Sequence, residues 1–105
     1  MKISRFDRLT TLAARESRKH SKRGATLTAR IGAFRQIMEG ASWKKPTDAK
    51  KDFGTADPVG GNRIVFDLCG NSYRVVAVIN YQIGVAEIRF AGTHEEYDKI
   101  DATSV

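Results

Sequence analysis

Near the end of the chain, His94 and Tyr97 stand three residues apart, and Arg89 lies just before them. A histidine exchanges protons near neutral pH, a tyrosine transfers a proton or stacks on a base, and an arginine offers a planar fork to phosphate oxygens. With Arg74, these side chains suit metal-independent cleavage of RNA. That reaction needs a base for the ribose 2′-hydroxyl, an acid for the leaving oxygen, and cations for the charged phosphorane.

Each of these four residues also has a purely structural alternative. His94 and Thr93 can cap a final helix, Tyr97 can belong to the core, and Arg74 and Arg89 can form surface ion pairs, which contribute little in water. Chemistry is favoured over these alternatives only if the four side chains converge. The elements that carry them therefore decide the interpretation.

Three alternating segments predict a meander of strands over 62–69, 72–81 and 85–91. A two-residue turn at Gly70-Asn71 would pair Asp67 with Arg74 and Val65 with Val76. A second turn, centred on Ile83-Gly84, would pair Asn80 with Glu87 and Val78 with Arg89, and would place Thr93 near Arg74.

This register sorts the strand residues onto two faces of the predicted sheet. One face is almost wholly apolar and needs a cover of helices: Ile64, Phe66, Leu68, Tyr73, Val75, Ala77, Ile79, Ala86, Ile88 and Phe90. The other face is half polar and is expected to be open to solvent or ligand: Arg63, Asp67, Arg74, Val76, Val78, Asn80, Glu87 and Arg89. The four candidate residues would meet at the edge of this open face.

The segment before the strands predicts helices. Apolar residues at helical spacing run from Phe6 to Ala13 and continue into a basic stretch, Gly24 interrupts the pattern, and a second helix is predicted over 25–39 with Gly40 at its end. Residues 1–4 are either a short strand or a frayed start. We therefore expect one α+β domain over 1–105: a helical hairpin (1–40), a short helix and loop (41–61), the meander (62–91), and a C-terminal active-site segment with a short helix (92–101).

The charge is unevenly distributed along the chain. The net charge is +6, and residues 1–51 carry 14 basic against 4 acidic side chains, whereas residues 52–105 carry 4 against 8. A basic surface favours nucleic-acid contact, because each neutralised phosphate releases a counterion; a solvated basic helix is the alternative. Candidate RNA contacts are Lys44, Lys45, Lys50, Lys51, Arg63 and, more weakly, Lys99.

Other classes of protein receive no support. Cys69 is the only cysteine, so no internal disulfide or cysteine zinc site is expected, and a reducing, cytoplasmic setting is the simplest interpretation. The acidic residues of 95–101 do not converge as metal ligands on a short helix, so we expect no metal and no cofactor. No apolar run is long enough to span a membrane.

Several motifs carry a resemblance to a known family. They are GNRIVF at 61–66, GNSYRVV at 70–76 and IRFAGTHEEYDKID at 88–101, together with WKKP at 43–46 and INY at 79–81. Over roughly residues 41–101 the chain resembles the HigB-type toxins of bacterial toxin–antitoxin pairs, within the RelE/ParE group. Residues 1–40 fit that pattern less well because of their dense basic run.

The resemblance implies a RelE-like fold, with two N-terminal helices packed on a small, mostly antiparallel sheet. It also implies a metal-independent messenger-RNA endonuclease that acts on translating ribosomes and is silenced by a HigA-type helix-turn-helix antitoxin. Arg74 and Arg89 would then stabilise the transition state, and His94 and Tyr97 would act in proton transfer or positioning.

Two other functions stay open. A ParE-like toxin with the same fold would inhibit DNA gyrase by binding and would cleave nothing, since a fold does not fix a function. A non-catalytic RNA- or DNA-binding module would depend on the basic helices and would tolerate the loss of His94.

Overall fold

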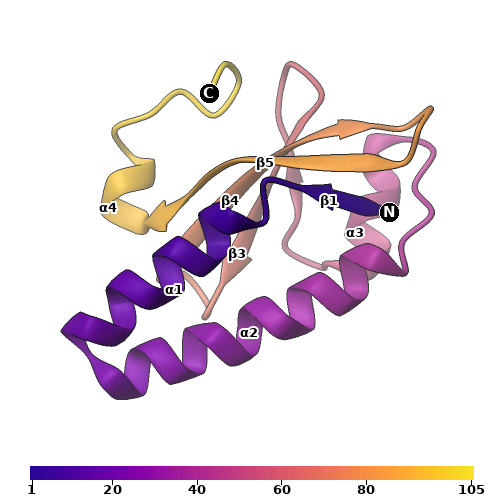
Figure 1. The fold of residues 1–105 in the computed structure, drawn as a ribbon. Coiled ribbons are helices and arrows are strands. Elements are labelled where there is room, and N and C mark those ends of the chain that lie inside the picture. The colour runs from indigo at the N-terminus through magenta and orange to yellow at the C-terminus, as the bar shows by residue number, and fades with distance from the viewer.

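The computed structural model describes residues 1–105 as a pair of helices packed against a five-stranded sheet (Figure 1). In chain order, the elements are β1 (Lys2–Ser4), α1 (Asp7–Lys19), α2 (Ser21–Glu39), a 3-10 turn η1 (Pro46–Asp48), α3 (Ala49–Asp52), β2 (Asp57–Pro58), β3 (Arg63–Leu68), β4 (Tyr73–Asn80), β5 (Val85–Thr93) and α4 (His94–Tyr97). The strand order is β1-β5-β4-β3-β2. Only the β1–β5 pair is parallel, so the predicted α+β class and mostly antiparallel sheet are confirmed.

The core lies between the helical hairpin and one face of the sheet. Period-2 alternation in the strands and helical spacing in α1 and α2 direct apolar side chains toward each other. The buried cluster joins Leu9, Leu12, Leu27, Ile31, Phe34 and Met38 of the helices to Ile64, Phe66, Leu68, Tyr73, Val75, Ala77, Ile79, Ala86 and Ile88 of the strands. Nine of the ten predicted inward strand residues are therefore in this core, and Phe90 is the exception.

The boundary between the two helices differs from the prediction. The break falls at His20, whose extended backbone (φ −147°, ψ 97°) separates α1 from α2, and Gly24 lies inside α2. Gly24 is buried, and a methyl group there would collide with Ser17 of α1. This glycine allows the two helices to approach closely near the hairpin end, so it is a packing residue and not a break.

The β3–β4 register is as predicted, with Asp67 opposite Arg74 and Val65 opposite Val76. The predicted β4–β5 register is wrong. Asn80 pairs with Val85 and Val78 pairs with Glu87, because a four-residue turn joins the strands.

The Asn80 side chain stabilises this turn. Its carboxamide oxygen accepts the backbone N–H groups of Gln82 and Ile83, and Gly84 at φ +67° closes the turn. A bulge opposite Val76 and Ala77 then shifts the register again.

The bulge changes which way the end of β5 faces. Phe90 pairs with Val76, so it lies on the face away from the helices, and Gly92 instead of Thr93 stands opposite Arg74. That face is also less open than predicted, since Val65 and Val76 are buried. The segment after α4 runs back toward the loop before β3 (Figure 1), where Arg63 donates hydrogen bonds to the carbonyl oxygen of Val105.

Candidate active site at the α4 end of the sheet

Arg74 and Tyr97 meet on the face of the sheet away from the helices. The guanidinium carbon of Arg74 lies 5.7 Å from the centre of the Tyr97 ring, and Arg74 Nε is 3.2 Å from a carboxylate oxygen of Asp67. The same guanidinium also donates to the side-chain and main-chain oxygens of Asn71. Only 13% of the Arg74 side chain is exposed, so these contacts hold its guanidinium in one orientation. The ion pair of Arg74 with Asp67 is therefore unlike a solvated pair on the protein surface.

His94 is the first residue of α4, but it does not cap the helix. Thr93 does so: its hydroxyl accepts the Glu96 N–H, while the Glu96 carboxylate accepts the Thr93 N–H. The His94 ring has Nε2 3.5 Å from an Asp98 oxygen, and its Nδ1 is buried without a hydrogen-bond partner. Apart from the Asp98 contact, the imidazole therefore has no hydrogen-bond partner inside the protein.

A surface pocket of about 330 Å³ lies beside His94. Its walls come from both helices, from the β3–β4 turn and from the start of α4: Glu16, Arg23, Asn71, Ser72, Tyr73, Thr93, His94 and Glu95. Asn71 belongs to this pocket and also binds Arg74. One residue thus connects the histidine side of the site to the arginine and tyrosine side.

Arg89 is not part of this group. It lies at the bulge, its Nη1 is 3.1 Å from a Glu87 oxygen, and it lines a second pocket with residues of the β1–α1 junction. Phe90 lines the same second pocket, and its ring centre is 6.3 Å from that of Tyr97. The structure therefore brings Arg74 and Tyr97 into contact and places His94 in a pocket whose lining includes Asn71, a partner of Arg74. Arg89 lies in a separate pocket, beside Phe90.

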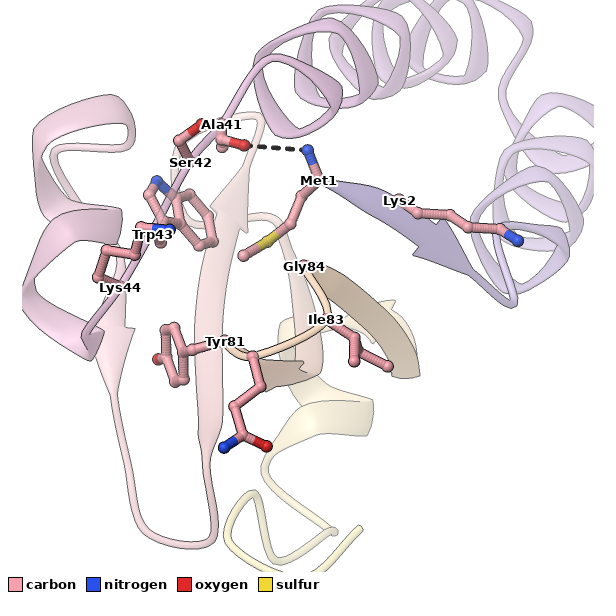
Figure 2. A pocket seen from close by; sticks show the side chains of 10 residues that line it. Met1, Lys2, Ala41, Ser42, Trp43, Lys44, Tyr81, Ile83 and Gly84 are labelled. Atoms are coloured by element: carbon pink, nitrogen blue, oxygen red, sulfur yellow. Dashed lines mark hydrogen bonds between the residues drawn. The ribbon is translucent and has the colours of Figure 1, made fainter.

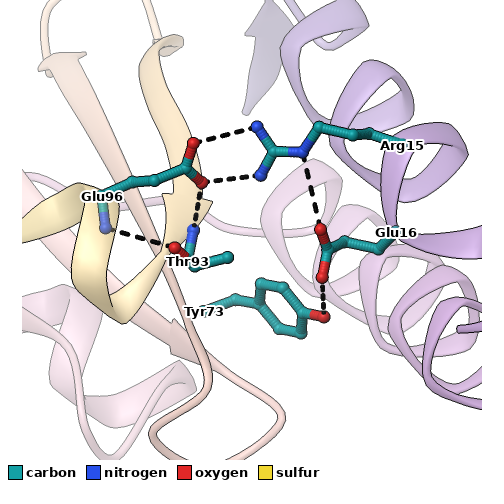
Figure 3. Close-up of polar contacts among 5 residues, drawn as sticks. All are labelled: Arg15, Glu16, Tyr73, Thr93 and Glu96. Atoms are coloured by element: carbon teal, nitrogen blue, oxygen red, sulfur yellow. Dashed lines mark hydrogen bonds and ion pairs between the residues drawn. The ribbon is translucent and has the colours of Figure 1, made fainter. Parts of the chain in front are cut away.

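A network of charged and hydroxyl groups fixes α4 against α1 (Figure 3). Arg15 donates two hydrogen bonds to the Glu96 carboxylate, at 2.6 and 3.0 Å, and its Nε is 3.5 Å from Glu16. The Tyr73 hydroxyl donates to Glu16 at 2.7 Å. This chain of contacts determines where the helix carrying His94 and Tyr97 can lie.

The same contacts shift the pKa values of two groups. Hydrogen bonds from Arg15 lower the pKa of Glu96 to about 2. Partial burial opposes this shift, and the hydrogen bond from the Thr93 backbone adds to it. Burial, followed by the hydrogen bond to Glu16, raises the pKa of Tyr73 to about 12. Glu96 is therefore ionised, and Tyr73 is a neutral donor, across the physiological range.

Sequence reasoning missed Arg15 and Glu16, which appeared only as part of a basic helix. One signal could have indicated Glu96: a threonine followed three residues later by a glutamate is the pattern of a capping box. Nothing in the sequence pattern joins Arg15 to Glu96, 81 residues later.

The predicted RNA-contacting lysines lie elsewhere. Lys44 and Lys45 precede η1, and Lys50 and Lys51 belong to α3, at the opposite end of the molecule from α4 (Figure 1). All four are exposed, and Asp48 binds the backbone N–H groups of the first two.

The two remaining candidates lie in or beside the segment that follows α4. Arg63 is engaged by the backbone of Val105 and of Gly61. Lys99 is exposed just after α4, with its backbone N–H bonded to Glu96. Arg63 thus has a visible structural role, and Lys99 is free to contact a ligand.

Another pocket, of about 430 Å³ (Figure 2), lies beside the amino terminus, at the other end of the sheet from α4 (Figure 1). It is lined by Met1, Lys2, Ala41, Ser42, Trp43, Lys44, Tyr81, Gln82, Ile83 and Gly84, and the Met1 amino group donates to the Ala41 carbonyl across its rim. It contains no histidine, carboxylate or arginine. Its lining does not suit the cleavage chemistry outlined above.

No cluster of three or more His, Cys, Asp or Glu side chains is arranged to hold a metal ion. None of the helices has the length and apolar character needed to cross a membrane. Among known families, the model of HigB_toxin, described as the RelE-like toxic component of a toxin-antitoxin system, matches residues 28–100. A search of curated proteins finds no significant match.

Proposed function

Because this chain belongs to the HigB family of RelE-like toxins and is thus the toxic component of a toxin–antitoxin system, we propose that it is an endoribonuclease that cleaves messenger RNA on translating ribosomes. Membership of such a system implies an antitoxin partner. We further propose that the antitoxin is of the HigA helix-turn-helix type. Action on ribosomes would make the protein cytoplasmic.

The observation that carries the proposal is the grouping of Arg74, His94 and Tyr97 around Asn71 and α4. In the proposed reaction, the ribose 2′-hydroxyl attacks the adjacent phosphorus, the bond to the 5′-oxygen breaks, and a cyclic phosphate and a 5′-hydroxyl result. Only the substrate and protein side chains take part. His94, which lines the pocket beside Asn71, transfers a proton to or from these oxygens.

Arg74 would stabilise the negative charge that grows on the phosphorane. Its ion pair with Asp67 and its bonds to Asn71 orient the guanidinium before RNA binds, and such preorganised cations are the largest single source of catalysis in many enzymes. Tyr97 would stack on a base beside the cleaved bond or share in proton transfer. Arg89, which lies in a separate pocket beside Phe90, would act on a more distant part of the substrate.

The exposed lysines at the other end of the molecule suit a different role. Lys44, Lys45, Lys50 and Lys51 are too far from α4 to touch the cleaved phosphate, so we assign them to the backbone of ribosomal RNA. Their replacement would weaken ribosome association nearly uniformly across messages, as expected for phosphate contacts.

Primer extension on a defined message in a bacterial translation extract tests the proposal. The wild-type chain should create new 5′ ends only when translation proceeds, and His94→Ala and Arg74→Ala should abolish them. His20→Ala is a matched control, since His20 is exposed at the α1–α2 junction. Intact message with the wild-type chain would refute the nuclease, and a DNA supercoiling assay would then test inhibition of gyrase.

A further inference from the structure

Three arginines from distant parts of the sequence surround the second pocket, which has a volume of about 330 Å³. Arg5 lies between β1 and α1, Arg8 lies in the first turn of α1, and Arg89 lies at the bulge of β5. The other residues of the lining are Asp7, Thr11, Phe90 and Ala91. We refer to this site as the arginine pocket.

Two of the three guanidinium groups are held by carboxylates. Arg5 makes a two-bond contact with Asp7, at 3.0 and 3.1 Å, and Arg89 donates to Glu87 at 3.1 Å. Arg5 adopts a left-handed backbone conformation (φ 59°), which is unfavourable for a residue with a side chain. The chain thus accepts local strain at the position that directs Arg5 toward its partner.

Arg8 differs from the other two. No carboxylate oxygen lies within salt-bridge distance of it, and its Nε is buried with no hydrogen-bond partner. Buried donors in folded proteins are nearly always paired, so an orphaned one needs an explanation. Since Arg8 lines the arginine pocket and makes no ion pair, its guanidinium is available to an anionic group bound there.

We propose that the arginine pocket binds a phosphate group of the RNA substrate, away from the cleaved bond, with Arg8 as its principal ligand. The RNA assignment rests on the function proposed above. Planar guanidinium groups match phosphate oxygens with paired hydrogen bonds. Asp7 and Glu87 would keep Arg5 and Arg89 in place beside the bound group without neutralising Arg8.

The position of the pocket favours RNA as its occupant. Phe90 lines the pocket and contacts Tyr97, and Tyr97 contacts Arg74. Cations and aromatic rings therefore alternate from the arginine pocket to the candidate active site, which is the pattern of a track for single-stranded nucleic acid. Arg5 and Arg8 lie outside residues 28–100, so this part of the track is not covered by the family match.

Nuclear magnetic resonance of the arginine side chains provides a direct test. The isolated chain, labelled with ¹⁵N-arginine, would be titrated with a 2′-O-methyl tetranucleotide, which lacks the attacking hydroxyl. The Nε–Hε signal of Arg8, assigned with Arg8→Lys, should shift, while that of Arg30, exposed on α2, should not. Arg8→Gln should weaken binding about tenfold and reduce its salt slope by roughly 0.7, whereas Arg30→Gln should change neither.

Two outcomes would overturn the inference. One is an Arg8 signal that stays fixed up to about 1 mM oligonucleotide, above the usual non-specific range of roughly 10⁻⁴ to 10⁻⁶ M. The other is a response to a glutamate-rich peptide but not to the oligonucleotide, which would make the pocket a contact for protein. Thermal melting of each variant would verify that it folds.

The pocket and the nuclease activity can fail separately. If message cleavage depends on His94 but the Arg8 signal does not shift, the phosphate-binding proposal is refuted and the proposed function stands. If the message stays intact but the Arg8 signal shifts, the proposed nuclease activity is refuted and the phosphate-binding site stands.

Discussion

Replacing Glu96 with glutamine should destabilise the protein by about 1–2 kcal/mol near neutral pH. Glutamine keeps an oxygen for the Thr93 N–H but loses the charge that binds Arg15. The pKa of Glu96 falls from 4.5 to about 2 in the folded chain. At roughly 1.36 kcal/mol per pKa unit, this is an upper limit of about 3.4 kcal/mol.

Solvent screening reduces that limit. The side chains of Glu96 and Arg15 are 42% and 34% exposed, and exposed ion pairs contribute only about 0.2–1 kcal/mol. The Glu96 carboxylate accepts two hydrogen bonds from Arg15 and a third from the Thr93 backbone. We therefore expect a loss of stability between that of an exposed ion pair and the upper limit of about 3.4 kcal/mol. For a domain of this size, each kcal/mol should lower the melting temperature by roughly 4–8 °C.

The sign of the pH dependence follows from the direction of the shift. A carboxyl whose pKa is lowered by folding stabilises the folded state above its unfolded pKa, and this contribution disappears as the pH falls. For Glu96, the window runs from about 4.5 down to about 2. The stability gap between wild type and Glu96→Gln should therefore be full at pH 7 and should close across this window.

Urea denaturation followed by circular dichroism, at several pH values from 7 to 2.5, measures the gap. Glu95→Gln is the matched control, because Glu95 is an exposed residue of the same helix. A gap of equal size at pH 7 and pH 3 would refute the electrostatic account. Equal destabilisation by the two substitutions would show that helix α4 responds to any loss of charge.

Other substitutions test separate contacts. Tyr73→Phe should lower the free energy of unfolding by about 1–3 kcal/mol, measured by urea denaturation, because it removes the hydroxyl that donates to the buried Glu16 carboxylate. Tyr81→Phe should leave that free energy unchanged, because the Tyr81 hydroxyl is buried without a partner. Equal losses from the two substitutions would contradict this. Gly24→Ala should destabilise through collision with α1, whereas Gly32→Ala, which meets open space in the same helix, should stabilise by about 0.5–1 kcal/mol, as thermal melting can measure. Arg63→Ala should speed amide exchange in residues 98–105, because it releases the Val105 carbonyl; unchanged exchange would argue against that anchor.

Local patterns were sufficient to predict much of the sheet. A two-residue turn, together with one apolar and one half-polar face of the strands, fixes the β3–β4 register. That register predicts the ion pair between Arg74 and Asp67. The meeting of Arg74 with Tyr97 also followed from the predicted faces. Its immediate contacts, such as Asn71, depend on the conformation of a turn and could not be predicted.

Long-range and irregular features were beyond the sequence pattern. The bulge near Arg89 is a one-residue irregularity without a sequence signature here, and it separates Arg89 from the other three candidates. Gly24 was interpreted as a break because glycine disfavours helices, but close helix packing outweighs that local preference. Arg5 and Arg8 are brought to the site by the parallel pairing of β1 with β5, which a segment of three residues cannot reveal.

The contact between Arg15 and Glu96, and the pairing of β1 with β5, also affect the order in which the chain can fold. Both join the beginning of the chain to its last strand and helix, and contacts across such long loops form late. During synthesis the basic helices emerge first, without the sheet that covers their apolar side. We expect a nascent chain to lack a completed site until its last residues have left the ribosome that makes it.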